Sequence, residues 1–177
     1  MYNEKKHING LPRETKQFTK TRYNNCYTYA INQPNSPFTE RPYSDYNECQ
    51  IGNLGGHGKK YKRNCFGYTD WNKKNIVRAV EEDLIKIGLK MTRTTLKMFI
   101  QNEKAWKVAL CLEKYSSGTT GDYHWYRQNI SGTWSHKKGM SKVYFKDDKG
   151  KRIYNPEKCD RGGYNKFVGF FMIEPIN

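Results

Sequence analysis

Residues 106–113, with the sequence Trp-Lys-Val-Ala-Leu-Cys-Leu-Glu, are the stretch that most constrains the fold of this chain. The run is short and apolar and lies between polar segments, which is typical of a buried β-strand. Further strands are predicted over residues 123–128, 133–136, 142–145, 152–154 and 167–173, and loops containing glycine separate most of them. The C-terminal half of the chain is therefore predicted to form an antiparallel sheet.

A short helix is predicted upstream of the strands, over residues 26–32, with the sequence Cys-Tyr-Thr-Tyr-Ala-Ile-Asn. Asn24 or Asn25 is the expected N-cap, because asparagine side chains accept hydrogen bonds from the first free amides of a helix. Pro34 is the expected stop. This helix places Cys26 at its first position.

A second helix is predicted to start after Asp70 or Asn72 and to end at Gly88. Its apolar residues recur at helical spacing and form one stripe, made of Ile76, Val77, Val80, Leu84, Ile85 and Ile87. A short helix or turn is expected over residues 95–102. Helices followed by antiparallel strands predict an α+β fold.

The 177 residues fit one domain, which is large enough to bury a core. Residues 1–22 are predicted to be a polar N-terminal arm, and residues 23–177 a single α+β domain. Residues 33–62 are rich in Pro, Asn, Ser, Tyr and Gly, and they are predicted to be a long loop inserted in that domain.

The chain is strongly basic, with 32 Lys and Arg against 17 Asp and Glu and a formal net charge of +15. Such a charge favours contact with polyanions through a basic surface. The basic residues are spread along the chain in short runs, which is typical of a solvated face. Five cysteines without any CxxC pair argue against a disulfide framework and a zinc ribbon, so no metal or cofactor is expected.

No apolar run approaches the roughly 20 residues that span a bilayer, so no transmembrane segment is expected. The first residues, Met-Tyr-Asn-Glu-Lys-Lys, lack the apolar stretch of a signal peptide. The protein is therefore expected to be soluble, and either cytoplasmic or released by lysis or particle delivery.

The order of one cysteine and two histidines suggests thiol chemistry. Cys26 opens the first helix, where free amides and the helix dipole stabilise a thiolate. His124 and His136 lie on either side of the turn at residues 131–132, so they can face each other across a hairpin. A thiol, a base and a group that orients the base are the parts that acyl transfer needs. An ion pair of Cys26 with His124 would lower the thiol pKa below about 8.5 and raise the imidazole pKa above about 6.5.

Three segments carry a resemblance to a known superfamily. They are Asn-Cys-Tyr-Thr-Tyr-Ala at 25–30, Asp-Tyr-His-Trp-Tyr-Arg at 122–127 and Gly-Thr-Trp-Ser-His-Lys at 132–137. In this order they resemble the papain-like cysteine peptidase superfamily, nearest to its NlpC-type cell-wall hydrolases, over about residues 20–175. The resemblance implies a papain-like fold, in which the helix that carries the nucleophile packs on an antiparallel sheet. It also implies that Cys26 is the nucleophile, His124 the base and His136 the orienter, with Tyr23 near the oxyanion site.

A protein of this kind is a thiol-dependent hydrolase, a cysteine peptidase or amidase, and its substrate is a peptide or amide such as peptidoglycan or protein. Two assignments stay open. Cys65, within Asn-Cys-Phe-Gly-Tyr at 64–68, has a similar local motif and is the alternative nucleophile. If His136 is the base instead, Asn155 is its natural orienter, and Asp147 or Asp148 is an acidic alternative.

Two other classes of function compete with the hydrolase. The first is a nucleic-acid-binding module, in which exposed aromatic and basic side chains of one sheet face form a stacking platform: Trp125, Tyr126, Arg127, Trp134 and Lys137. The second is a papain-like domain without catalysis that serves as an interaction protein.

Overall fold

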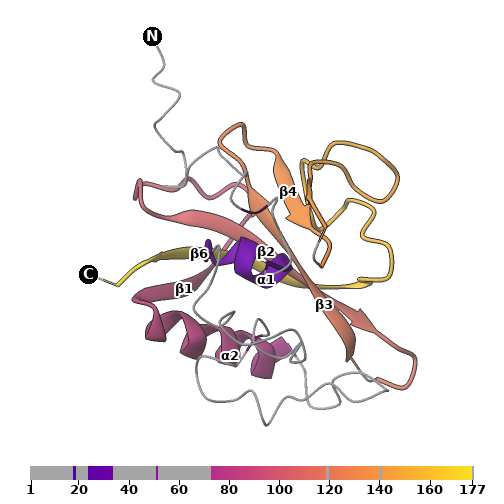
Figure 1. Cartoon of the computed structure of the whole chain (residues 1–177), viewed down its shortest axis with the longest axis horizontal. Helices are drawn as coiled ribbons and strands as arrows, with labels where there is room; N and C mark the ends of the chain where they lie inside the picture. The colour runs from indigo at the N-terminus through magenta and orange to yellow at the C-terminus, as the bar shows by residue number, and fades with distance from the viewer. Residues whose placement is uncertain are drawn as a thin grey trace.

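A six-stranded antiparallel sheet, with the strand order β1-β6-β2-β3-β4-β5, forms the body of the protein (Figure 1). The computed structural model describes residues 18, 24–33, 51, 73–118, 120–139 and 141–176. Helices α1 (Cys26–Ala30) and α2 (Lys73–Lys86) precede the strands β1 (Leu89–Thr94), β2 (Trp106–Lys114), β3 (Thr120–Gln128), β4 (Trp134–Lys137), β5 (Val143–Tyr144) and β6 (Lys166–Pro175). The predicted α+β class, with an antiparallel sheet in the C-terminal half, is confirmed.

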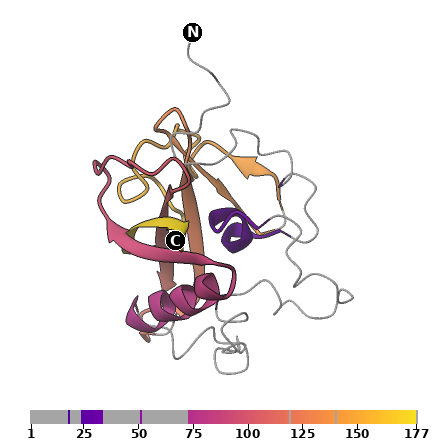
Figure 2. The ribbon, with the colours of Figure 1, turned by 90° about the vertical axis from the view of Figure 1, so that its left-hand side faces the viewer.

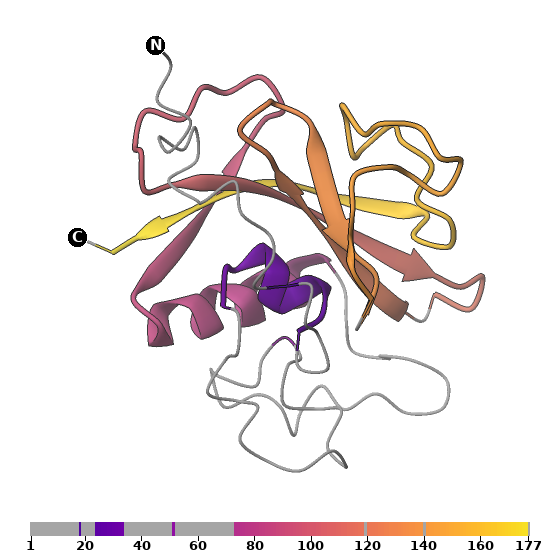
Figure 3. The same ribbon diagram turned by 45° about the horizontal axis from the view of Figure 1, so that its top comes forward.

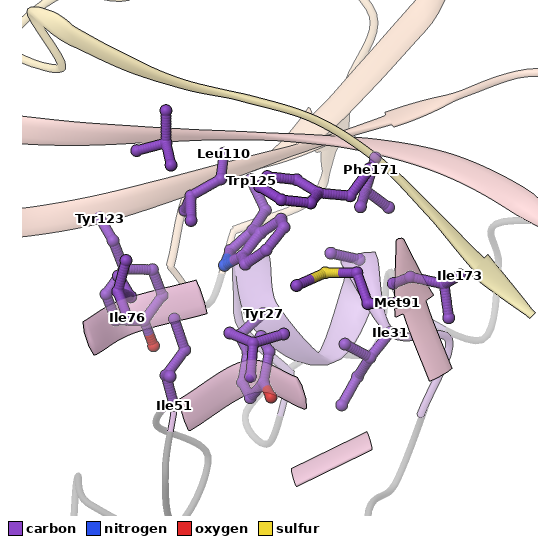
Figure 4. Close-up of a cluster of buried hydrophobic side chains, with 14 of the residues drawn as sticks. Tyr27, Ile31, Ile51, Ile76, Met91, Leu110, Tyr123, Trp125, Phe171 and Ile173 are labelled. Carbon is purple, nitrogen blue, oxygen red and sulfur yellow. The ribbon is translucent and has the colours of Figure 1, made fainter. Parts of the chain in front are cut away.

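Both helices pack against the same face of the sheet, as Figure 3 shows. The main hydrophobic cluster fills the space between them with side chains from α1, α2, β1, β2, β3 and β6. Figure 4 shows Trp125 within this cluster, together with Tyr27 of α1, Ile31 directly after α1 and Phe171 of β6. Burial of these large apolar side chains is the main force that holds α1 on the sheet.

A second cluster lies on the opposite face of the sheet, beneath the segment that joins β5 to β6. It contains Tyr126, Trp134, Ile153 and Phe170, among others, and it packs against partly buried side chains of residues 159–167. Figure 2 shows α1 on one side of the sheet and this long connection on the other. The central strands are therefore covered on both faces.

The side chains of β3 alternate between these two layers, as successive residues of a strand must. Tyr123 and Trp125 belong to the cluster under the helices, whereas Tyr126 belongs to the opposite cluster. Arg127 also faces α1, because its guanidinium donates to the Tyr29 carbonyl at 3.2 Å and lies over the Tyr29 ring. This alternation determines on which face of the sheet each polar side chain of β3 lies.

Helix α1 is held at its start by a capping box. Asn25 Oδ1 accepts hydrogen bonds from the amides of Tyr27 (2.9 Å) and Thr28 (3.0 Å), and the Thr28 hydroxyl accepts one from the Asn25 amide (2.9 Å). Asn25 is thus the N-cap, as one of the two predicted alternatives. The helix ends at Ala30, earlier than predicted, and Asn32 adopts a left-handed conformation with φ of 55° that asparagine tolerates.

Two differences from the sequence prediction concern the strands. Residues 89–94 had no predicted element, yet they form the edge strand β1, which pairs with β6 along its whole length. The strand expected over residues 152–154 is reduced to two isolated bridges, Trp134 with Ile153 and Lys146 with Arg152. Both segments are short and depend on a neighbouring strand for their hydrogen bonds, which a local pattern does not reveal.

Single residues from the predicted arm and from the predicted loop insertion are buried. Phe18 packs edge-on against Tyr29, with ring centroids 5.1 Å apart, and Ile51 belongs to the cluster under the helices. Most of residues 1–22 and 34–72 lie outside the described residues, and so do the predicted helix stop Pro34 and the predicted caps Asp70 and Asn72.

Replacing Asn25 by alanine removes both side-chain hydrogen bonds to the first free amides of α1. We expect Asn25→Ala to lower the free energy of unfolding by about 0.5–2 kcal/mol, measured by urea denaturation. Asn25→Ser is the matched control, because serine is an equally good N-cap and should keep most of the stability. Equal losses in the two variants would contradict a capping role.

Candidate functional site

Two buried histidines meet on the face of the sheet opposite α1. The β3–β4 hairpin turns through Gly132, whose φ of 79° explains the glycine, and its register sets Tyr126 directly opposite His136. His124 lies two residues before Tyr126 on the same face, so it meets His136 diagonally. The His124 Nε2 and His136 Nδ1 atoms are 2.7 Å apart, which confirms the predicted meeting of the two side chains across the hairpin.

The donor and acceptor roles in this histidine pair follow from the partner of His136. His136 Nε2 lies 3.0 Å from the Lys146 carbonyl oxygen, which can only accept, so this nitrogen carries a hydrogen. In a neutral ring the other nitrogen, Nδ1, is then an acceptor, and His124 Nε2 must donate to it. Neutral His124 is left with an unprotonated Nδ1. The Lys146 carbonyl thereby fixes the tautomers of both rings.

Aromatic rings enclose the two imidazoles. Tyr164 stacks on His124 with ring centroids 4.7 Å apart, and Tyr126 stacks on His136 at 5.0 Å. The Tyr164 hydroxyl donates to Asp122 Oδ2 at 3.1 Å, which fixes the ring that covers His124. The rings hold both histidines in place and exclude water from most of their surface.

Burial sets the protonation of the pair. It lowers the pKa of His124 well below the usual range, and the neighbouring His136 and the positive charge of Lys138 lower it further. Burial also lowers the pKa of His136, although the Lys146 carbonyl acts in the opposite direction. Both rings are therefore neutral near pH 7. This reverses the sequence-based expectation of a raised imidazole pKa at His124.

Cys26 packs on the other face of the sheet, in the cluster with Tyr123 and Trp125. Its thiol donates a weak hydrogen bond to the Tyr123 carbonyl oxygen, with Sγ and O 3.9 Å apart, so the sulfur lies beside the backbone next to His124. The predicted packing of the cysteine helix against this hairpin is confirmed. The hydrogen bonds of these described side chains do not join Cys26 to either imidazole.

Burial raises the pKa of the Cys26 thiol to about 12, and the negative charge of Asp122 acts in the same direction. The Trp125 amide and the positive charge of Lys137 act in the opposite direction without overcoming burial. The thiol is therefore protonated near pH 7, and the ion pair expected from the sequence is wrong for this structure. Helix α1 has only five residues, so its dipole has little effect on the sulfur.

The remaining predicted site residues lie elsewhere or outside the described residues. Asn155 Oδ1 accepts from the Glu157 amide at 2.9 Å, so this side chain caps a turn, and the Lys146 carbonyl takes the position beside His136. Asp147 accepts from the Lys151 amide at 2.8 Å, and Asp148 pairs with Lys138. Tyr23 and Cys65 lie outside the described residues.

The sequence did not indicate three groups that shape the site: the Tyr164 ring, the Lys146 carbonyl and the buried side chain of Lys137. Tyr164 follows two glycines in a loop, where no periodic pattern marks it. A backbone carbonyl carries no sequence signature at all. The burial of Lys137 on the α1 face could have been predicted from its position one residue after His136, because neighbouring residues of a strand point to opposite faces of the sheet.

The stacking platform expected for a nucleic-acid-binding module is wrong. All five of its side chains are buried, and strand alternation divides them between the two faces: Trp125, Arg127 and Lys137 face α1, whereas Tyr126 and Trp134 lie in the opposite cluster. Packing on both sides of the sheet covers the surface that nucleic acid would need.

Cys26, Cys111 and Cys159 are free thiols. Within the described ranges, no group of three or more His, Cys, Asp or Glu side chains is arranged to hold a metal ion. The helices of the described part of the chain include none that is long and apolar enough to cross a membrane.

The fold and site define a sheet-rich α+β domain with a buried, hydrogen-bonded histidine pair on one face of the sheet and a buried cysteine on the other. No family model matches the chain, and no solved structure matches it. The chain is similar to insoluble matrix shell protein 1 of Ruditapes philippinarum, with 29% identity over 154 residues, which cover 87% of this chain and 82% of that protein.

The neutral histidine pair makes stability depend on pH in a defined direction. Histidines titrate near about 6.5 in the unfolded chain, whereas the folded imidazoles stay neutral at lower pH. Below that value the unfolded state binds more protons, so we expect the free energy of unfolding to fall from pH 7 to pH 5. The slope is up to about 1.4 kcal/mol per pH unit for each histidine. Urea denaturation at several pH values measures it.

The double variant His124→Gln and His136→Gln is the control for this slope. It removes both titrating groups while leaving polar side chains at these positions, so its stability should change less between pH 7 and pH 5. An equally steep fall in the double variant would assign the pH dependence to other groups.

Proposed function

We propose that this protein is a papain-like thiol hydrolase that cleaves an amide or peptide bond, with Cys26 as nucleophile, His124 as general base and His136 as the residue that orients the base. The observation that carries the proposal is the ordered chain from the Lys146 carbonyl through His136 to His124. It gives His124 one fixed tautomer with an unprotonated nitrogen, which is what a general base needs.

The lowered imidazole pKa and the raised thiol pKa favour a neutral mechanism over a preformed ion pair. Cys26 and His124 pack on opposite faces of β3, so this mechanism requires substrate binding to bring the two side chains within hydrogen-bond reach. His124 Nδ1 then takes the thiol proton as the sulfur attacks the substrate carbonyl carbon. The resulting imidazolium then gives that proton to the leaving amine as the C–N bond breaks, which leaves a thioester on Cys26. Water, activated by the same imidazole, hydrolyses the thioester. The thiol must leave the Tyr123 carbonyl when substrate binds.

Chemistry and charge narrow the substrate to peptides and amides, with peptidoglycan and protein as the leading classes. A net charge of +15 favours a substrate within an anionic polymer. The similarity to a shell matrix protein favours an extracellular setting over the cytoplasm.

The test uses p-nitrophenyl acetate as a small acyl donor, with peptide mapping by mass spectrometry to locate the acetyl group. We expect a thioester at Cys26 in the wild type at pH 7 to 8, because His124 removes the thiol proton during attack. Cys26→Ala should abolish this adduct, and His124→Ala should slow its formation by about 10²–10⁴.

Cys159→Ala is the matched control, since Cys159 is the more exposed free thiol and has no proposed role. It should be acylated at Cys26 like the wild type. Acylation that moves to Cys65, and is lost in Cys65→Ala, would transfer the nucleophile to that residue. A domain that forms no thioester at either cysteine is the inactive interaction protein.

A second candidate function is the binding of an anionic polysaccharide in an extracellular matrix. The observation that favours it is a group of exposed basic residues next to β5 and in the following hairpin, here called the basic surface: Lys142, Lys146, Lys151 and Arg152. None of these four forms an ion pair with a carboxylate of the described residues, whereas Lys149 pairs with Asp160. Phe145 and Tyr154 are 48% and 67% exposed beside them.

The bridge within this hairpin sets Lys146 and Arg152 directly opposite each other. Like charges in that position repel, and a bound anion would offset the repulsion. The similarity to an insoluble matrix shell protein favours an extracellular polymer over nucleic acid as the ligand.

Charge reversal tests this surface. We expect the double variant Lys146→Glu and Arg152→Glu to elute from a heparin column at much lower salt than the wild type, because fewer counterions are released on binding. Lys97→Glu with Lys104→Glu is the matched control, with the same change in net charge at exposed positions outside the surface. Equal shifts in the two variants, or binding to a single-stranded oligonucleotide in place of heparin, would contradict the proposal.

A further inference from the structure

Lys137 is a buried cation on the same face of the sheet as Cys26. On β4 the Ser135 hydroxyl lies 2.7 Å from the Tyr29 hydroxyl, so Ser135 faces α1. Lys137 follows two residues later and therefore faces α1 as well. Cys26 precedes Tyr29 by three residues, about one helical turn. The same face of α1 thus meets Ser135 at one end and approaches Lys137 at the other.

The strand register places Lys137 still closer to the sulfur. The β3–β4 pairing ends at Tyr126 with His136, and Lys137 is the next residue of β4 beyond this last pair, on the side toward Trp125. The Cys26 thiol also lies against residues 123–125 of β3. It donates to the Tyr123 carbonyl oxygen, and a hydrogen bond from the Trp125 amide lowers its pKa. The Lys137 side chain and the thiol are therefore both buried on the α1 face at this end of β3, and each charge affects the pKa of the other group.

Within the described part of the chain, the Lys137 ammonium is hydrogen-bonded to carbonyl oxygens and not paired with a carboxylate. Nζ donates to the carbonyl oxygens of Gly139 at 2.8 Å and Ser141 at 2.5 Å, and the whole residue is inaccessible to solvent. No carboxylate of the described residues forms an ion pair with it. A buried charge without a counter-ion is unfavourable, so an anion formed beside it is stabilised.

We propose that Lys137 is the counter-ion of the Cys26 thiolate, the charged state that forms when the thiol gives up its proton. Lys137 transfers no proton in this role: the proton goes to His124 or to solvent, and the ammonium attracts the negative sulfur. The proposal adds a group to the proposed hydrolase site and rests on that function for its catalytic meaning. The electrostatic contact itself does not require turnover.

Other titratable groups near the sulfur also affect the stability of the thiolate or are already engaged by a hydrogen bond. Asp122 of β3 opposes the thiolate, and the Tyr164 hydroxyl, bonded to Asp122, is itself neutral because burial raises its pKa. Asp83 of α2 is engaged by the Tyr27 hydroxyl at 2.8 Å. Burial lowers the pKa of Lys137 to about 8, so the ammonium is present at pH 7. Among the described charged groups that act on the sulfur, Lys137 is the cation that favours the thiolate.

The experiment measures alkylation by iodoacetamide at individual cysteines, by peptide mass spectrometry, between pH 7 and pH 9.5. The reported quantity is the alkylation rate of Cys26 divided by that of Cys111, a second buried thiol whose pKa burial also raises to about 12. Cys111 lies in the cluster on the opposite face, so general loosening of the fold cancels in the ratio. We expect Lys137→Met to lower this ratio about tenfold, which corresponds to one pKa unit.

Two matched variants separate this effect from the loss of any lysine. Lys107 is also buried and bonded to two carbonyls, those of Leu96 and Met98, but it faces away from α1. Lys138 is the exposed neighbour of Lys137. Lys107→Met and Lys138→Met should both keep the wild-type ratio. A Lys137→Met ratio equal to or above that of the wild type would overturn the proposal.

If Lys137→Met does not fold, the wild type decides the question. Its ratio should fall as Lys137 loses its proton near pH 8, and a ratio that is flat or rises through that range would overturn the proposal. The readout is thiol ionisation and not hydrolysis. If the alkylation ratio falls as expected but no thioester forms on Cys26, the hydrolase is rejected and the Cys26–Lys137 interaction is kept. If the thioester forms but the ratio does not fall, the interaction alone is rejected.

Discussion

Burial of β3 on both faces is the constraint on which the rest of the structure depends. A strand covered on one side only can direct its polar residues to water, but β3 carries polar side chains into both layers. Each of them needs a partner, because an unpaired buried polar group is costly. Arg127 finds the Tyr29 carbonyl, and His124 finds His136. The contacts that satisfy these groups also fix the position of α1 and the loop after β5.

The same burial determines the chemistry available to the site. A sulfur and two imidazoles at a wet surface would exchange a proton and form an ion pair, as the sequence pattern suggested. Enclosed by tyrosines and tryptophans, each of them favours its neutral form. In the proposed mechanism the neutral thiol and the neutral base exchange a proton only at the moment of attack, when the substrate carbonyl oxygen takes up the negative charge.

The sequence was a good guide where a local pattern has a local cause. The stripe of α2, the apolar run of β2, the Asn25 cap and the hairpin at Gly132 all follow from neighbouring residues, and the meeting of His124 with His136 follows from that hairpin. The faces on which Cys26 and His124 lie did not follow. They depend on how α1 docks against β3, which is a tertiary contact between distant segments. The position of Asn155 was missed for a similar reason, since a backbone carbonyl can take the place of a side chain.

The distance along the chain between Cys26 and its partners has a consequence for folding. The contacts of α1 with β3 and β4 join residues 97 and 106 positions apart, whereas the two histidines are only 12 positions apart. Closing a long loop costs more entropy than closing a hairpin, so local contacts form first. We expect the histidine pair to assemble early with its hairpin and the cysteine to arrive late. The Cys26 thiol would then be buried only when α1 docks in the last step of folding. In the partly folded chain it would therefore not yet lie near the histidine pair.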